Sequence, residues 1–265
     1  MTGISHRADS MAARFSAAAS TYDHSADIQR QTAKKVMNLM SGFAAAVNVI
    51  EIGCGTGILT RLLIKRFPSA RIECVDISDA MIRVACDRIG SGENVIFSTL
   101  DIGEKSAQFD LAVSNAALHW MVPLKTAFAK LNAVLCDGAH IAFSIMLDGT
   151  LAELKSARAR VASHKQIGMK LPARTEILEG LGINGFMIMS EARETAAVIY
   201  DSAWSFLKTI HNQGVTGGIY SGQLLNRTEL TMLVEDYDRS CRIEDGGVTA
   251  TYEILYVLAR KVNNG

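Results

Sequence analysis

The chain has 265 residues, 49% of them hydrophobic and 20% charged, and its 27 basic side chains balance 27 acidic ones. This composition predicts one globular domain with a full core, and the zero net charge argues against nucleic acid or an anionic membrane as a partner. The five cysteines are scattered, and neither a signal segment nor an apolar run of membrane-spanning length is present, so we expect a cytoplasmic protein with reduced thiols and no metal site.

Short apolar runs alternate with amphipathic segments in the first half of the chain. Apolar residues recur at helical spacing from Ala33 to Met40, and Ser78 is placed to cap a later helix. The repeated β-α-β order of buried strands predicts a doubly wound, mostly parallel sheet with helices on both faces. The expected strands lie at 47–52, 71–76, 94–101, 109–115 and 139–147, with helices between them at 58–67, 78–89 and 124–135.

The pattern changes after residue 148, where more helices are expected than can pack on the faces of the sheet. We therefore expect an α/β fold with seven strands and a helical cap inserted after strand five, over the ligand end, because ligands of open α/β sheets bind at the carboxyl ends of the strands. The expected helices lie at 151–161, 173–182, 202–213 and 228–238, and the two closing strands at 186–200 and 248–261. We expect a single domain made of an N-terminal segment 1–30, a core 31–147, a cap with the sixth strand 148–247 and a closing strand 248–265.

The stretch VIEIGCGTGILT, residues 49–60, ends a strand in an acid and continues with three alternate glycines. A glycine turn between a strand and a helix lets a ligand approach the backbone closely. The spacing lacks the third glycine of a dinucleotide fingerprint, because Ile58 stands in its place. Asp76 ends the second strand, where an acid can accept both hydroxyls of a ribose, a feature that fits NAD or S-adenosylmethionine. Asp101, after the third strand, could accept a hydrogen bond from an adenine amino group, with Ile102 against the ring.

Four segments in chain order, EIGCGTG, VD, LDI and FDLAVSN, resemble the motif series of class I S-adenosylmethionine-dependent methyltransferases. The resemblance implies the Rossmann-like fold of that class and S-adenosylmethionine as the cofactor. The next segment, SNAALHW, lacks the Asn-Pro-Pro-aromatic tetrad usual in enzymes that methylate base amino groups, which argues against nucleic acid. The implied cofactor-binding residues are Glu51, Gly53, Cys54, Gly55, Gly57, Asp76, Ile77, Met81, Asp101, Ile102, Ser114 and Asn115, with Tyr22 and Gln29 from the N-terminal segment.

The segment RFSAAASTYDHSADIQRQ, residues 14–31, resembles the start of the malonyl-acyl-carrier-protein O-methyltransferases of biotin synthesis, the BioC family. The resemblance continues through SNAALHW, DGTLAELK, FLKTI and TYEILYVLAR and covers nearly the whole chain. Thr56 departs from it, since other members have Pro there, and the residues after Lys208 lack the small Gly-Ala pair of some members. The resemblance implies that the enzyme methylates the free carboxylate of a malonyl group on acyl-carrier protein, which gives the ester that starts pimeloyl and biotin synthesis.

The chemistry of such a reaction narrows the catalytic candidates. A malonyl carboxyl group, with a pKa of about 4, is an anion at neutral pH and needs no general base. The enzyme must align it with the sulfonium methyl group and exclude water. By the resemblance, Tyr22 lies near the methionine end of the cofactor and closes the site, while His119 could hydrogen-bond the acyl group. Lys208 is expected to receive the carboxylate, with Trp204, Leu207 and Ile210 on the packed side of its helix.

Carrier proteins in such systems are acidic, so a basic face is expected on the cap, with Lys155, Arg158, Arg160 and Lys165 as candidates. We expect a monomer. Three other functions stay open: methylation of a free small carboxylic acid such as aconitate, nicotinamide-dependent redox chemistry, and S-adenosylmethionine binding by a catalytically silent partner protein. Dependence on a carrier protein, the identity of the bound cofactor and turnover of an acyl thioester would separate them.

Overall fold

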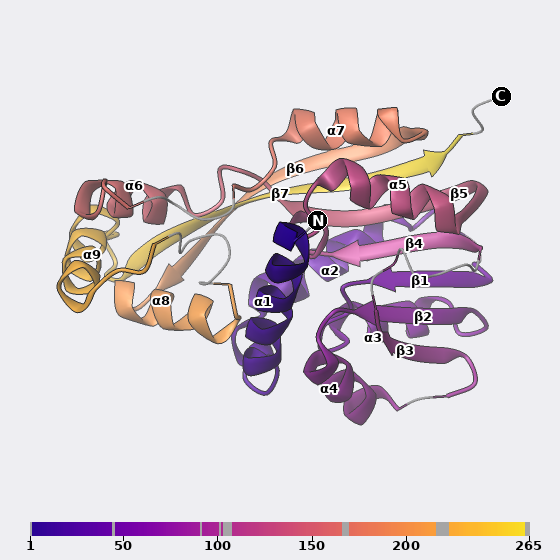
Figure 1. Cartoon of the computed structure of the whole chain (residues 1–265), viewed down its shortest axis with the longest axis horizontal. Helices are drawn as coiled ribbons and strands as arrows, with labels where there is room; N and C mark the ends of the chain where they lie inside the picture. Colours follow the sequence, from indigo (N-terminus) through magenta and orange to yellow (C-terminus); the bar gives the residue numbers. More distant parts are fainter. Residues whose placement is uncertain are drawn as a thin grey trace.

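A seven-stranded sheet organises the computed structural model, which describes residues 2–43, 46–90, 92–100, 102, 108–165, 170–215 and 223–262 (Figure 1). The strand order is β3-β2-β1-β4-β5-β7-β6. The first five strands pair in parallel, and β7 is antiparallel to both of its neighbours. The strands are β1 (Asn48–Ile52), β2 (Arg71–Asp76), β3 (Val95–Thr99), β4 (Phe109–Asn115), β5 (Leu135–Met146), β6 (Phe186–Tyr200) and β7 (Val248–Lys261). The expected seven-stranded, mostly parallel sheet is therefore confirmed.

The strand order reverses direction between β1 and β4, and a crevice at the carboxyl ends of these strands is where open α/β sheets bind ligands. Helices on both faces cover this part of the sheet. One apolar cluster joins α2 and α3 to one face through Val36 and Leu63, and another joins α5 and α7 to the opposite face through Phe128 and Ile177. These helices and their neighbours are α1 (Thr2–Ala18), α2 (Asp27–Leu39), α3 (Ile58–Arg66), α4 (Asp79–Ile89), α5 (Leu124–Val134) and α7 (Arg174–Ile183).

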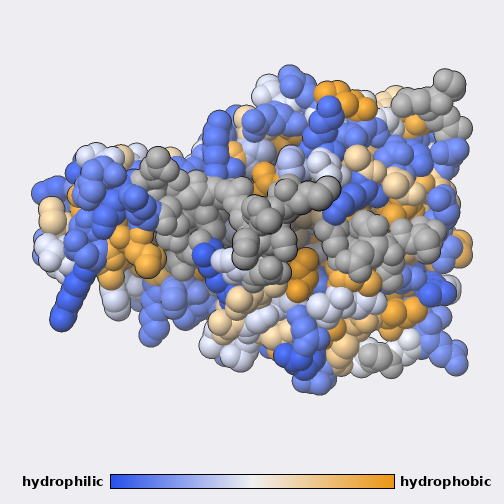
Figure 2. Space-filling model, viewed as in Figure 1, coloured by the Kyte–Doolittle hydropathy of each residue, from blue (hydrophilic) through white to orange (hydrophobic). Residues whose placement is uncertain are grey.

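Three helices form a cap around the far ends of β6 and β7: α6 (Ala152–Val161), α8 (Ala203–Asn212) and α9 (Arg227–Ser240) (Figure 1). Their apolar side chains meet inside the cap, where the rings of Phe206 and Tyr237 stack with centroids 5.2 Å apart. The surface at this end, on the left in Figure 2, is mainly hydrophilic. The apolar interior of the cap is continuous with the cluster under α2 and α3, and the cap is held on two strands that extend beyond the parallel part of the sheet.

The helix expected at 173–182 lies elsewhere than in the cap. It forms α7, which packs beside α5 on the sheet, and its Leu181 is buried in the same apolar cluster as Phe128. A Cβ atom at Gly180 would lie 3.1 Å from the Phe128 ring, so the absence of a side chain there permits this close packing. The strand expected at 139–147 begins earlier, at Leu135, which pairs with Phe109 ahead of a register shift in the β4–β5 pairing; Gly138, with a φ of 76°, lies in this irregular part.

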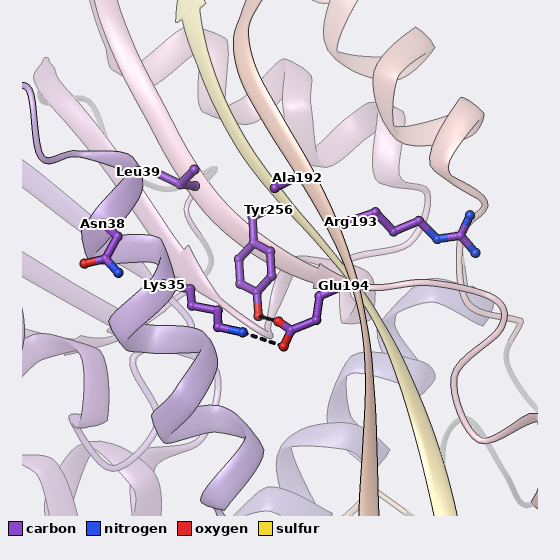
Figure 3. A pocket seen from close by; sticks show the side chains of 7 residues that line it. All are labelled: Lys35, Asn38, Leu39, Ala192, Arg193, Glu194 and Tyr256. Atoms are coloured by element: carbon purple, nitrogen blue, oxygen red, sulfur yellow. Dashed lines mark hydrogen bonds and ion pairs between the residues drawn. The ribbon is translucent and has the colours of Figure 1, made fainter.

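The helix α2 is tied to the outer strands across a groove of about 470 Å³ (Figure 3). The Lys35 amine forms an ion pair with Glu194 of β6, and the hydroxyl of Tyr256 on β7 donates to the same carboxylate at 2.7 Å. These contacts fix the position of α2 against the sheet. No helix among the described residues is both long and apolar enough to cross a membrane.

Candidate functional site

The glycine turn after β1 shows where a ligand can approach. Gly53, Gly55 and Gly57 have φ values of 68°, 53° and 85°, in the left-handed region that favours glycine. A Cβ atom at Gly53 would collide with Ala117, and one at Gly57 would lie 2.5 Å from the Ile89 side chain. A Cβ atom at Gly55 would meet nothing within 4 Å. Gly53 and Gly57 are therefore required by packing, whereas Gly55 borders open space.

Asp76, at the carboxyl end of β2, holds this turn in place. One oxygen of its carboxylate accepts a hydrogen bond from the Gly55 N–H at 2.9 Å, and the other accepts from the Ser78 N–H at 2.8 Å. A carboxylate has about four acceptor positions, so positions remain for two hydroxyl groups of a ligand. Burial raises the pKa of Asp76, and the backbone N–H groups of Ser78, Gly55 and Ile77 oppose that effect. The side chain of Ser78 accepts from the Met81 N–H at 3.2 Å, which confirms the expected helix cap.

The N-terminal segment lies against the same region. The short helix η1 (Tyr22–Ser25) follows α1, and the half-buried Tyr22 lies within the field of Asp76. Burial raises the pKa of the Tyr22 phenol, and the charges of Asp76 and Asp23 raise it further, so the phenol is protonated at neutral pH. The hydroxyl of Ser16, on α1, lies 2.9 Å from that of Ser78. Two predicted ligand residues, Tyr22 and Asp76, are thus brought together although 54 positions separate them in the sequence.

A second group of predicted residues meets at the carboxyl end of β4. The Asn115 amide donates to the backbone oxygen of Gln29 at 2.9 Å and accepts from the Ser144 hydroxyl at 2.8 Å. The side-chain oxygen of Gln29 is buried and has no hydrogen-bond partner among the described residues. A buried acceptor without a donor is uncommon and is accounted for if a ligand supplies the donor. The hydroxyl of Ser114 is already used, because it donates to the Ile52 oxygen at 2.9 Å.

Glu51 lies deeper than the ligand region. It is 1% exposed and accepts hydrogen bonds from the Thr60 hydroxyl at 2.6 Å and from the Cys74 thiol at 3.6 Å. Burial raises the pKa of Glu51 to about 8, so the side chain is mainly protonated at neutral pH. Its described partners belong to the protein interior, and its predicted role in cofactor binding stays a prediction.

Replacing Glu51 with glutamine should remove a pH-dependent loss of stability. The folded state holds the proton with a pKa of about 8, against 4.5 for an unperturbed side chain. The wild-type free energy of unfolding should therefore fall as the pH rises through this window, by at most about 1.4 kcal/mol per pH unit. Glutamine keeps an acceptor for Thr60 and does not ionise. The free energy of unfolding of the variant should therefore rise relative to that of the wild type as the pH increases from 4.5 to 8. Urea unfolding across this pH range measures the difference in unfolding free energy between the variant and the wild type. A difference that does not change with pH would contradict a protonated Glu51 in the folded state.

His119 is buried in the short helix η3 (Leu118–Trp120), close after β4. Burial lowers the pKa of His119 to about 3, so the ring is neutral at physiological pH. Its Nδ1 atom has no hydrogen-bond partner among the described residues. The neighbouring Trp120 ring contacts the edge of Phe15 from α1, with centroids 5.3 Å apart. The arrangement leaves His119 able to form one hydrogen bond with a bound group beneath the N-terminal segment.

The packed face expected for α8 is right for Ile210, which is buried, and for Leu207, which packs against the apolar cluster, and it is wrong for Trp204. The buried positions are Ala203, Phe206 and Ile210, whereas Trp204 is 58% exposed and Lys208 is exposed. The two exposed residues are four apart and so lie on the same side of the helix, away from the packed face. The structure therefore contradicts the inward orientation on which the catalytic assignment of Lys208 depended.

Two of the four basic residues expected on the face of the cap are paired with acids, and the other two donate to backbone oxygens. Arg160 forms an ion pair with Asp236, and Lys165 forms one with Glu229. Arg158 is buried and donates to a backbone oxygen, and the Lys155 amine likewise donates to the backbone oxygen of Asp148. These four residues thus hold the cap together instead of forming an unpaired cationic surface.

The other predicted cofactor residues divide into three cases. Asp101 lies outside the described residues. Cys54, Met81 and Ile102 are buried, and Ile77 is half-buried. Across the described ranges, no three His, Cys, Asp or Glu side chains form a group that could hold a metal ion.

The contacts of Asp23 were missed from the sequence. This residue joins η1 to the glycine turn through Thr56 and to α4 through Arg88. The Tyr-acid pair at 22 and 23 was the sequence feature that could have indicated a role for Asp23, but its partners become clear only in the folded structure.

Comparisons with known proteins identify relatives along most of the chain. A family model described as "Methyltransferase domain" matches residues 50–141. A malonyl-[acyl-carrier protein] O-methyltransferase of Hahella chejuensis is 32% identical over 92% of this chain and 87% of its own length. Another, of Priestia megaterium, is 30% identical over 94% of this chain and 96% of its own length. The crystal structure of the N-methyltransferase NodS from Bradyrhizobium japonicum, in complex with S-adenosyl-L-homocysteine, shares the fold with a TM-score of 0.53 and 16% identity, covering 88% of this chain and 87% of that one.

Proposed function

Because the chain belongs to the malonyl-[acyl-carrier protein] O-methyltransferase family, we propose that it transfers the methyl group of S-adenosylmethionine to the free carboxylate of a malonyl thioester on acyl-carrier protein. The product is the malonyl methyl ester that starts pimeloyl and biotin synthesis. The observation that supports this most directly is the glycine turn, whose open position at Gly55 lies beside the Asp76 carboxylate and beneath an N-terminal segment that contributes Tyr22 and Gln29.

The residues present fit S-adenosylmethionine. Asp76 has acceptor positions for the two ribose hydroxyls, and the unpaired Gln29 oxygen can accept from the ammonium group of the methionine part. Tyr22, which lies in the field of Asp76, would cover the cofactor. The cofactor, when bound, supplies an electrophilic methyl group on a sulfonium ion.

The protein's own groups then have positioning tasks. The malonyl carboxylate is already ionised at neutral pH, so no residue has to remove a proton from it. The neutral His119 can donate one hydrogen bond to the acyl group and so fix its orientation. The N-terminal segment and the cap exclude water, which would otherwise solvate the carboxylate and reduce its reactivity.

The test is turnover with labelled S-adenosylmethionine and a panel of acceptors: malonyl-acyl-carrier protein, malonyl-CoA, free malonate and aconitate. We expect methyl transfer to malonyl-acyl-carrier protein and little to the two free acids. Methylation of aconitate or malonate without a thioester would instead support a methyltransferase of small free acids. Binding of the cofactor without turnover of any acceptor would contradict an enzymatic role. A monomeric state and a cytoplasmic location stay predictions.

A further inference from the structure

Asp23 connects three separate parts of the fold at the edge of the cofactor region. One carboxylate oxygen accepts a hydrogen bond from the Thr56 hydroxyl at 2.5 Å, and the other forms an ion pair with Arg88 of α4. The backbone oxygen of Asp23 accepts from the Arg30 guanidinium of α2 at 2.7 Å. Every oxygen atom of this residue is therefore used to hold η1 in place.

The position of Asp23 makes these bonds relevant to the site. Its chain neighbour is Tyr22, whose phenol lies in the field of Asp76, and its partner Thr56 lies between Gly55 and Gly57 in the glycine turn. The charge-assisted bonds of a carboxylate are stronger than neutral ones and constrain direction. Fixing Asp23 thus fixes the backbone from which Tyr22 projects.

We propose that Asp23, Thr56 and Arg88 form a latch that positions Tyr22 over bound S-adenosylmethionine, and that the latch must open for the cofactor to enter and for S-adenosylhomocysteine to leave. This inference rests on the proposed function for the identity of the cofactor. The three are positioning residues, because they act on the cofactor through Tyr22. The Arg88 and Asp23 side chains are 31% and 28% exposed, so water can reach the ion pair and the latch can open without unfolding the core.

The first test weakens each bond separately and follows release of S-adenosylhomocysteine by stopped-flow displacement. Thr56→Val removes the hydroxyl while keeping the shape of the side chain, and Arg88→Met removes the charge while keeping an apolar stem. We expect each change to speed release roughly fivefold to tenfold, as for loss of one hydrogen bond of about 1 kcal/mol. Thr56→Ser keeps the hydroxyl and should restore a release rate near that of the wild type.

Arg83→Met is the matched control. Arg83 lies on the same helix α4 and forms an ion pair with Asp79, on a more exposed part of the surface. The variant loses an arginine–aspartate pair that does not involve η1, so the rate of S-adenosylhomocysteine release should be unchanged. Hydrogen exchange of residues 14–25 should quicken in Thr56→Val and Arg88→Met and stay constant in Arg83→Met.

Kinetic constants distinguish a latch from general destabilisation. The latch predicts a higher KM for S-adenosylmethionine in both variants with an unchanged KM for the malonyl substrate. Wild-type release rates in Thr56→Val and Arg88→Met, or an equal effect of Arg83→Met, would overturn the latch while leaving the proposed function intact. Failure of the wild-type protein to bind S-adenosylhomocysteine in calorimetry would overturn the proposed function itself.

Discussion

Asp76→Ala should weaken S-adenosylmethionine binding by about 1.5 to 3 kcal/mol, which is roughly a tenfold to hundredfold rise in the dissociation constant. The variant loses the acceptor for the ribose hydroxyls. It also leaves the N–H groups of Gly55 and Ser78 without their acceptor, so the glycine turn loses its support. Isothermal titration calorimetry on folded protein measures the change.

Two further variants make the Asp76 experiment specific. Asp76→Asn keeps one oxygen but directs an amide N–H toward a backbone N–H, so we expect weaker binding here as well. Asp79→Asn changes a nearby exposed acid whose partner is Arg83 and should bind the cofactor normally. An unchanged dissociation constant in Asp76→Ala would show that Asp76 does not contribute to cofactor binding.

Tyr22→Phe should retain the fold and lose most of the methyltransferase activity. The change removes only a hydroxyl, whose pKa is raised by burial and by the charge of Asp76, so the phenol is a hydrogen-bond donor beside the cofactor region. Loss of one such bond in the reacting complex lowers kcat/KM by about tenfold, and misplacement of the reacting groups adds to that loss. Steady-state kinetics with malonyl-acyl-carrier protein, together with thermal unfolding, checks both parts of the expectation.

The control for Tyr22→Phe is Tyr256→Phe. This substitution also removes a hydroxyl that lies near a carboxylate, because the Tyr256 hydroxyl donates to Glu194 in the groove of Figure 3. This groove is formed by α2 with β6 and β7, so the control should affect stability and leave kinetics unchanged. Full activity in Tyr22→Phe would assign Tyr22 to packing alone.

The sheet could be predicted closely because its signal is local. The ranges expected for β2, β4, β6 and β7 coincide with the structure. The interior strands β2 and β4 are mostly buried and give short apolar runs. Asp76 and Gly55 could likewise be expected to lie together, because the carboxyl ends of parallel strands meet at one edge of a sheet, and a hydrogen bond joins them in the structure.

The orientation of α8 could not be predicted from the sequence in the same way. The expected and observed packed faces share Ile210, but the sequence placed Trp204 on this face, whereas the structure buries Ala203 and Phe206. Hydrophobicity alone favoured Trp204, the larger side chain, but the interior of the cap accepts Phe206 against Tyr237. That choice depends on a partner helix about 30 residues further along the chain.

The place of β7 bears on how the protein folds during synthesis. This strand follows all the other described elements in the chain, yet it lies between β5 and β6 and pairs with both. While the ribosome is still making residues 248–261, β5 keeps an open side, β6 has no partner in the sheet, and the cap lacks the strand beneath it. Nascent chains fold from the N-terminus onward, so the cofactor half can form first while β6, with Met187 and Met189 exposed, waits as an unpaired strand prone to aggregation.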